Sequence, residues 1–195
     1  MAKLYFRYGA MNSGKTTALM QAAHNYEERG MAVVIVKPSA DSKGKERIVS
    51  RLGVGRAVDI LLGSQDDATQ VLEKAFTKKP FHCVVIDEAQ FLQPEQIEAL
   101  FWYAVEKDIP VLAYGIRTDF QTNGFPGSTR LLELAHEIQE LKTICRCGKK
   151  AMLNGRKLDG AFIFSGEQVA IDGEHNIEYE SLCPSCYRKF EAAGA

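Results

Sequence analysis

The sequence predicts an α/β fold in which a mostly parallel sheet is flanked by helices and followed by a smaller, cysteine-containing segment. Three observations lead to this prediction. Apolar strands alternate with helical segments through most of the chain, a glycine-rich turn joins the first strand to the first helix, and the composition shifts toward Cys, Gly and short strands near the end. Such alternation is typical of a parallel sheet covered on both faces. We therefore expect two domains, residues 1–141 and 142–195.

The first elements follow directly from the apolar pattern. Residues 4–8 are apolar and aromatic and end at a glycine, which predicts a buried strand. Residues 16–29 carry apolar side chains at helical spacing, and Gly30 ends this helix. The β-branched run 32–36 predicts the second strand.

The same alternation continues beyond a less regular stretch. Two further apolar runs predict strands, and three segments predict helices, one of which has Pro in its first turn. In chain order these are a helix over 66–77, a strand over 83–86, a helix over 94–105, a strand over 110–115 and a helix over 128–136.

Residues 39–57 interrupt this alternation because they are rich in Lys, Arg, Ser and Gly and have a weak apolar pattern. Two interpretations fit this composition. The segment is either a solvated surface loop or a mobile lid beside a phosphate site. The composition does not choose between them.

The overall composition excludes several classes of protein. The chain has 195 residues with 24 Lys and Arg against 25 Asp and Glu, so its net charge is −1, which argues against nucleic-acid binding through bulk positive charge. Hydrophobic residues make up 46% of the chain, enough to bury a core. No segment approaches the roughly 20 apolar residues of a membrane span. No signal-peptide run develops at the N-terminus, so we expect a cytoplasmic location.

A phosphate-binding loop is the strongest motif in the sequence. The pattern G-x-x-x-x-G-K-[ST] is matched between a predicted strand and a predicted helix, which is its proper context. Backbone N–H groups of such a loop cradle phosphates at a helix N-terminus. Lys15 would contact the β- and γ-phosphates of ATP, and the Thr16 hydroxyl would ligate Mg²⁺. The predicted nucleotide-binding residues are Gly9, Ala10, Met11, Asn12, Ser13, Gly14, Lys15 and Thr16.

Two carboxylates end the predicted strand 83–86. Asp87 is suited to hold Mg²⁺, and Glu88 can act as a general base toward water or a substrate hydroxyl. The alternative is a pair of solvated turn residues, but the phosphate loop favours a catalytic role. The two motifs indicate an enzyme that uses a nucleoside triphosphate, and they leave its phosphoryl acceptor open.

A third motif follows the strand over 110–115. Arg117 lies at the carboxyl end of that strand, where open α/β sheets bind ligands, and could stabilise charge on a transferring phosphoryl group. Phe120 and Phe125 could stack on a flat base. The alternative places Arg117 on the surface and both phenylalanines in the core.

Taken in order, GAMNSGKT, DEAQF and YGIRTDFQ…FPGS closely resemble the motifs of the type II thymidine kinases, and the resemblance covers essentially the whole chain. It implies a RecA-like phosphate-loop core with a small, ribbon-like zinc-binding domain. It also implies transfer of the γ-phosphoryl of ATP to the 5′-hydroxyl of thymidine or deoxyuridine, giving the monophosphate and ADP in nucleotide salvage. A homotetramer and feedback binding of dTTP are further implications.

The resemblance also assigns residues. Glu88 matches the general base, with Lys15 and Arg117 as the other catalytic residues. The family's lasso loop around the nucleoside corresponds to residues 169–179, with Tyr179 at the nucleoside; Ile116 falls where many members carry leucine. The implied nucleoside-binding residues are Met11, Glu88, Gln90, Ile116, Phe120, Phe125, Val169, Ala170, Ile171, Asp172, Gly173 and Tyr179.

The cysteines form two close pairs, Cys145 with Cys147 and Cys183 with Cys186, which is the ligand set of tetrahedral Zn²⁺. With all four positions taken by Cys, the metal would be structural. Disulfides are the alternative, disfavoured in a cytoplasmic chain. The fifth cysteine, Cys83, lies in a predicted strand and is expected to act as a buried hydrophobic residue.

Two other functions fit the motifs. One is a kinase of the same fold with a different deoxynucleoside preference. The other is a zinc-ribbon protein that binds nucleic acid and uses ATP hydrolysis as a switch, against which the net charge of −1 and the absence of a basic tail argue. We therefore expect neither nucleic acid nor a membrane as a partner.

Overall fold

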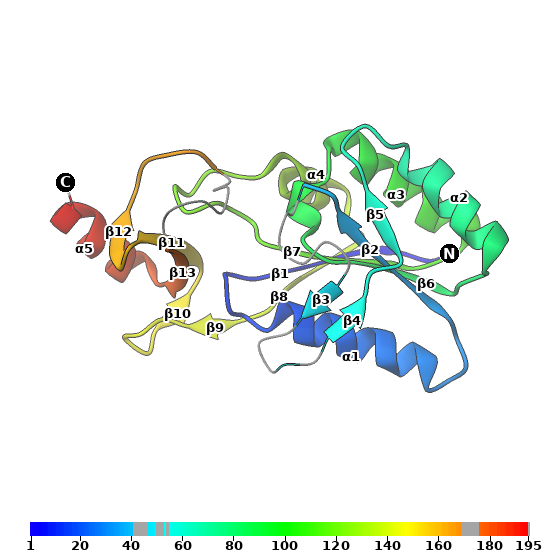
Figure 1. The fold of residues 1–195 in the computed structure, drawn as a ribbon, viewed down its shortest axis with the longest axis horizontal. Helices are drawn as coiled ribbons and strands as arrows, with labels where there is room; N and C mark the ends of the chain where they lie inside the picture. Colours follow the sequence, from blue (N-terminus) through cyan, green and yellow to red (C-terminus); the bar gives the residue numbers. More distant parts are fainter. Residues whose placement is uncertain (41–46, 50–52, 54, 169–175, 195) are drawn as a thin grey trace.

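The computed structural model describes residues 1–40, 47–49, 53, 55–168 and 176–194. Its centre is a six-stranded sheet whose neighbouring strands are all parallel (Figure 1). In spatial order the strands are β5 (Ile60–Leu62), β2 (Val33–Pro38), β6 (Cys83–Ile86), β7 (Val111–Gly115), β1 (Leu4–Tyr8) and β8 (Glu137–Glu140). The predicted parallel α/β sheet is confirmed.

Helices cover both faces of this sheet (Figure 1). One face packs against α1 (Lys15–Glu27), and the other packs against α2 (Ala68–Lys78), α3 (Pro94–Lys107) and α4 (Pro126–Leu134). Because side chains alternate along a strand, β6 sends Val84 and Ile86 toward α2–α4 and Val85 toward α1. The strands are therefore buried on both sides, which explains their continuous apolar sequences.

Two strands of the sheet and several helix ends differ from the sequence prediction. Neither β5 nor β8 was predicted, because β5 has only three residues and β8 is a polar edge strand with an exposed Ile138. The last helix of the sheet domain begins at Pro126 rather than at residue 128, since Pro suits the first helical position. It ends at Leu134 because Ala135 takes an extended conformation.

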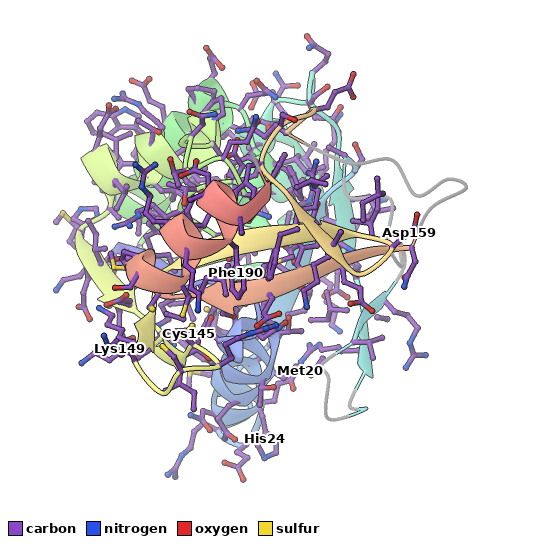
Figure 2. The ribbon with its side chains drawn as sticks, turned by 90° about the vertical axis from the view of Figure 1, so that its left-hand side faces the viewer. Met20, His24, Cys145, Lys149, Asp159 and Phe190 are labelled. Atoms are coloured by element: carbon purple, nitrogen blue, oxygen red, sulfur yellow. The ribbon has the colours of Figure 1, made fainter. Side chains whose placement is uncertain are left out.

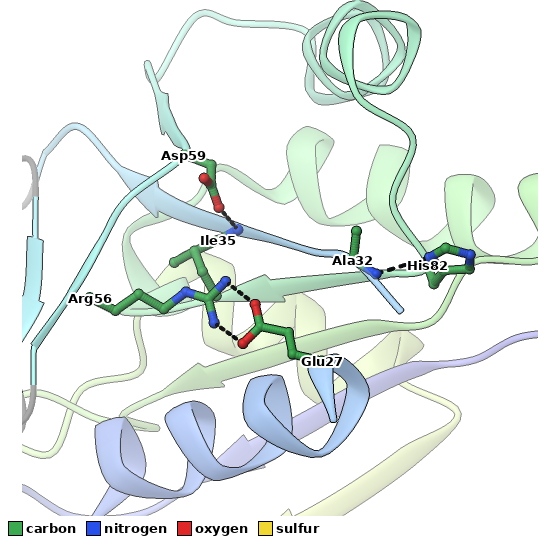
Figure 3. A network of polar contacts seen from close by, with 6 residues as sticks. All are labelled: Glu27, Ala32, Ile35, Arg56, Asp59 and His82. Carbon is green, nitrogen blue, oxygen red and sulfur yellow. Dashed lines mark hydrogen bonds and ion pairs between the residues drawn. The ribbon is translucent and has the colours of Figure 1, made fainter. Parts of the chain in front are cut away.

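The described part of residues 39–57 is docked against α1. Strands β3 (Arg47–Val49) and β4 (Gly55–Ala57) pair antiparallel, and Ile48 is buried in the core beneath α1. The Arg56 guanidinium donates to both carboxylate oxygens of Glu27, at 2.7 and 3.0 Å (Figure 3). Residues 41–46, 50–52 and 54 lie outside the described residues, so the lid interpretation stays a prediction.

A second, smaller unit, here called the Cys lobe, comprises β9–β13 and α5. Its strands are β9 (Thr143–Ile144), β10 (Lys150–Ala151), β11 (Leu153–Leu158), β12 (Ala161–Ile163) and β13 (Ile177–Leu182), followed by α5 (Pro184–Gly194). In Figure 2 the lobe faces the viewer, with Cys145 and Phe190 labelled on it. It has its own small core, which includes Cys145, Leu182 and Tyr187.

None of the helices in the described ranges is long and apolar enough to cross a bilayer.

Close backbone packing fixes α4 against the short 3-10 helix η1 (Ala89–Phe91). A Cβ atom added at Gly127 would collide with the Leu92 carbonyl and lie 3.0 Å from the Ala89 carbonyl oxygen. We therefore expect Gly127→Ala to destabilise the protein by about 1–3 kcal/mol, although Ala favours helices. Thermal unfolding measures the effect, with the exposed Thr129→Ala on the same helix as control. A melting temperature at or above that of the wild type would contradict this packing.

Candidate functional site

The phosphate loop connects β1 to α1 and has the backbone shape of an anion site. Asn12 and Gly14 lie in the left-handed region, with φ of 64° and 77°, which turns successive N–H groups to one side. A Cβ atom at Gly9 would collide with the Ser13 side chain and the Leu141 carbonyl, so only glycine fits there. The loop is thus shaped by its own sequence and by close contact with the chain that follows β8.

The lysine of the loop is held close to it. Lys15 is only 8% exposed, and its ammonium donates to the carbonyl oxygens of Gly9 at 3.2 Å and Ala10 at 3.0 Å. Thr16 is the second residue of α1 and is partly buried. Both side chains therefore lie at the helix N-terminus, where anions are favoured.

Asp87 and Glu88 leave the carboxyl end of β6, which is separated from β1 only by β7. Asp87 is 6% exposed. Burial, reinforced by the charge of Glu88, raises the pKa of Asp87 to about 7, while Lys37 and Lys15 act in the opposite direction. A buried carboxylate of this kind gains much from a nearby cation, which suits a metal ligand.

Lys37 is a residue of this region that the sequence reasoning missed. It is 3% exposed near the end of β2, and its charge acts on Asp87. Its only sequence signal was a cation directly after an apolar strand.

Gln90 ties Glu88 to the neighbouring strand. Its side chain is 2% exposed; its Nε2 donates to Glu88 Oε2 at 2.5 Å, and its Oε1 accepts from the Ile116 N–H at 3.2 Å. Glu88 itself has a φ of 50°, a conformation that non-glycine residues adopt at some energetic cost. The carboxylate is thus oriented by a buried amide that is anchored just beyond β7.

Arg117 lies beside the start of the phosphate loop. Its guanidinium is 5.6 Å from the centre of the Tyr8 ring, and it lines a small cavity together with Gly9, Ala10 and Asn154. The arginine is therefore close to the loop, as its predicted role requires. Its contact with phosphate stays a prediction.

Both predicted aromatic residues are buried. Phe125 is 4% exposed and meets Phe91 edge to face, with ring centres 5.6 Å apart. Phe120 is 1% exposed and lies under the guanidinium of Arg156, 3.7 Å from the ring centre. These contacts agree with the core interpretation of the two rings, and stacking on a base stays a prediction.

Arg156 is the most informative residue that the sequence reasoning missed. It is 3% exposed on β11, and its Nε donates to the Tyr179 hydroxyl at 3.0 Å. Its two terminal nitrogens donate to the carbonyls of Glu167 at 2.6 Å and Gln168 at 2.7 Å. One side chain therefore joins Phe120, Tyr179 and the chain leading to residue 169.

The remaining lasso residues, Val169, Ala170, Ile171, Asp172 and Gly173, lie outside the described residues, so their predicted contacts with a nucleoside are untested. The chain on both sides of them is held by side chains of the Cys lobe. Arg156 holds the carbonyls of Glu167 and Gln168 on one side, and Asp159 accepts from the Asn176 N–H on the other side at 3.2 Å.

The four predicted zinc ligands come together. The Sγ atoms of Cys145, Cys147, Cys183 and Cys186 all lie within 4.8 Å of one another. Four thiolates around one zinc ion would be roughly 3.8 Å apart. A tight turn holds the first pair, since the Gly148 N–H donates to the Cys145 carbonyl at 2.8 Å.

The thiols are free in the structure, and Cys83 is fully buried beneath α1, as predicted. The cluster could hold zinc, with no ligand position left for a substrate.

Zinc binding should be measurable directly. We expect about one zinc ion per chain by elemental analysis and its loss, with a lower melting temperature, in Cys183→Ser, because the small lobe core depends on the metal. Cys83→Ala is the matched control and should keep the metal. Protein purified without chelators that contains no zinc would overturn the assignment.

Comparison with known proteins agrees with this geometry. The family model for thymidine kinase matches residues 2–187. The thymidine kinase of Ruegeria pomeroyi is 47% identical, covering 100% of this chain and 96% of that protein. That of Shewanella oneidensis is 45% identical, covering 97% and 98%, and that of Enterobacteria phage T4 is 43% identical, covering 94% of each. This chain belongs to the thymidine kinase family.

Proposed function

We propose that this chain transfers the γ-phosphoryl group of ATP to the 5′-hydroxyl of thymidine or deoxyuridine, giving the monophosphate and ADP in nucleotide salvage. One observation carries the proposal. In a chain of the thymidine kinase family, the phosphate loop after β1 and the Asp87–Glu88 pair after β6 lie at the same edge of one parallel sheet.

The phosphate loop and Asp87 bind the triphosphate in this proposal. Lys15 moves from the loop carbonyls to the β- and γ-phosphates, a short step because its ammonium already lies over the loop. Thr16 and Asp87 are the residues that would hold Mg²⁺, which when bound neutralises charge on the phosphates. The burial of Asp87 and its raised pKa support this role.

Glu88 removes the proton of the 5′-hydroxyl as that oxygen attacks the γ-phosphorus. The hydrogen bond from Gln90 supports this role because it holds the carboxylate in one orientation. Arg117, beside the loop, stabilises charge on the transferring group.

The nucleoside is held between the sheet domain and the Cys lobe, which we assign to residues 1–141 and 142–195. Met11, Gln90, Ile116, Phe120, Phe125, Tyr179 and residues 169–173 form its pocket. Backbone groups of 169–173 read the base edge, since a buried amide rejects a base with the wrong donor–acceptor pattern. The contacts of Arg156 with Phe120 and Tyr179 support a common pocket.

We also propose feedback binding of dTTP, a homotetramer and a cytoplasmic location. A site for thymidine beside a phosphate loop suits dTTP, which carries both chemical groups. Four cysteines that gather as a metal site, rather than pairing in disulfides, fit a reducing compartment. The tetramer follows from the resemblance to the family.

Replacing Glu88, the proposed general base, tests the reaction. With labelled ATP and thymidine we expect labelled thymidine monophosphate, and in Glu88→Gln a fall in kcat of about 10²–10⁴-fold with ATP binding nearly unchanged. Glu95→Gln, at an exposed position of α3, is the control. An equal loss of ATP affinity would assign Glu88 to the metal instead. Phosphate release that is independent of thymidine would exclude the kinase activity. Faster transfer to another deoxynucleoside would identify that nucleoside as the substrate.

Arg156 provides a second test. Lysine keeps the charge but lacks the planar fork that reaches two carbonyls and a hydroxyl at once. We expect Arg156→Lys to raise the KM for thymidine about tenfold or more and to change the KM for ATP less than about twofold. Arg188→Lys, whose side chain is 81% exposed, is the control. Equal effects on both substrates would show that Arg156 supports the fold in general.

A further inference from the structure

One residue of the phosphate loop is held from outside the sheet domain. The Met11 N–H donates to Asn154 Oδ1 at 2.7 Å, and the Met11 carbonyl accepts from the Ser181 hydroxyl. Asn154 and Ser181 are directly paired across β11 and β13 and are 3% and 6% exposed. A single cross-strand pair of the Cys lobe therefore satisfies both backbone groups of Met11, a residue in the middle of the loop.

Asn154 also reaches a second segment of the site. Its Nδ2 donates to the Thr118 carbonyl at 2.9 Å, one residue after Arg117. The Thr143 hydroxyl adds a longer contact, 3.4 Å, to the carbonyl of Asn12, one of the two loop residues in the left-handed conformation. The Cys lobe thus hydrogen-bonds the phosphate loop at two successive residues, and Asn154 also joins the loop to the segment that follows Arg117.

These contacts come from the part of the lobe that lies next to its core and its cysteine cluster. Ser181 is two residues before Cys183, and Leu182 between them is fully buried in the lobe core. Because the Met11 N–H donates to Asn154, it stabilises the shape of the loop and does not serve as a hydrogen-bond donor to a phosphate. The position of the loop at Met11 and Asn12 is therefore set by the lobe as well as by β1 and α1.

We propose that Asn154 and Ser181 are positioning residues that place the phosphate loop for the nucleotide, so that nucleotide affinity depends on the docking of the Cys lobe. This role rests on the proposed function, since it takes the loop as the ATP site. Removing either partner leaves a buried N–H or carbonyl unpaired, and the loop shifts to find another partner. The expected weakening of nucleotide binding is about tenfold, an ordinary size for coupling between two parts of a protein.

A general structural role makes a different prediction. If the two side chains only hold the lobe and the sheet domain together, their loss lowers the melting temperature and weakens nucleotide and nucleoside binding alike. If they position the loop, nucleotide binding weakens clearly more than thymidine binding does, because Met11 is only one of several residues that we propose around the nucleoside.

The experiment measures binding of MgADP by calorimetry without nucleoside, in full-length Ser181→Ala, Asn154→Ala and the double variant, with zinc content and melting temperature recorded. We expect about tenfold weaker MgADP binding in each single variant and little further loss in the double, because both side chains hold one residue. For Ser181→Ala the KM for ATP should rise and that for thymidine should stay within about twofold. Lys189→Ala, at an exposed position of α5, is the control.

If the alanine variants fail to fold, two substitutions at position 181 test the role of the hydroxyl group alone. Ser181→Thr keeps the hydroxyl and should bind MgADP like the wild type, whereas Ser181→Val has the same shape without it and should bind about tenfold more weakly. Wild-type binding in both Ser181→Val and Asn154→Ala, or an equal loss for both substrates, overturns the positioning role. A wild-type protein that does not bind MgADP overturns the proposed function instead.

Discussion

The parallel pairing of β6, β7 and β1 is the constraint on which the rest of the site depends. Parallel strands all end at the same edge of a sheet, so the phosphate loop after β1, the Asp87–Glu88 pair after β6 and Arg117 after β7 meet there. The packing is close at this edge. A Cβ atom at Gly115 would lie 2.7 Å from Gln90 Oε1, so glycine at the end of β7 makes room for the amide that orients Glu88.

Buried amides then set the finer geometry. Gln90 joins Glu88 to Ile116, and Asn154 joins Met11 to Thr118, each with its nitrogen on one segment and its oxygen on another. An amide has both a donor and an acceptor, so one side chain can fix the distance between two loops. Leaving either end unpaired in a buried place is costly, and the network therefore favours a single arrangement.

How well each helix and strand could be predicted depended on its length and on how regular its apolar pattern is. Long apolar strands and helices with clear ends were predicted close to their observed bounds, as for β1 and α3. The short strand β5 and the polar edge strand β8 were missed because their pairing partners, rather than their own sequences, make them strands. Helix α5 was not predicted for a related reason, since few of its residues, chiefly Tyr187 and Phe190, pack on the lobe core.

By itself the sequence determined the phosphate loop, the carboxylates after β6 and the two cysteine pairs, because in each of these the chemistry lies in residues close together in the chain. Only the tertiary structure decided the roles of Arg156, Asn154 and Ser181. Met11 and Ser181 are 170 positions apart, and Met11 and Asn154 are 143 apart. No local spacing records which polar side chains of a short strand will be buried against a distant loop. Those contacts exist only after the lobe has folded and its unpaired polar groups have found partners on the sheet domain.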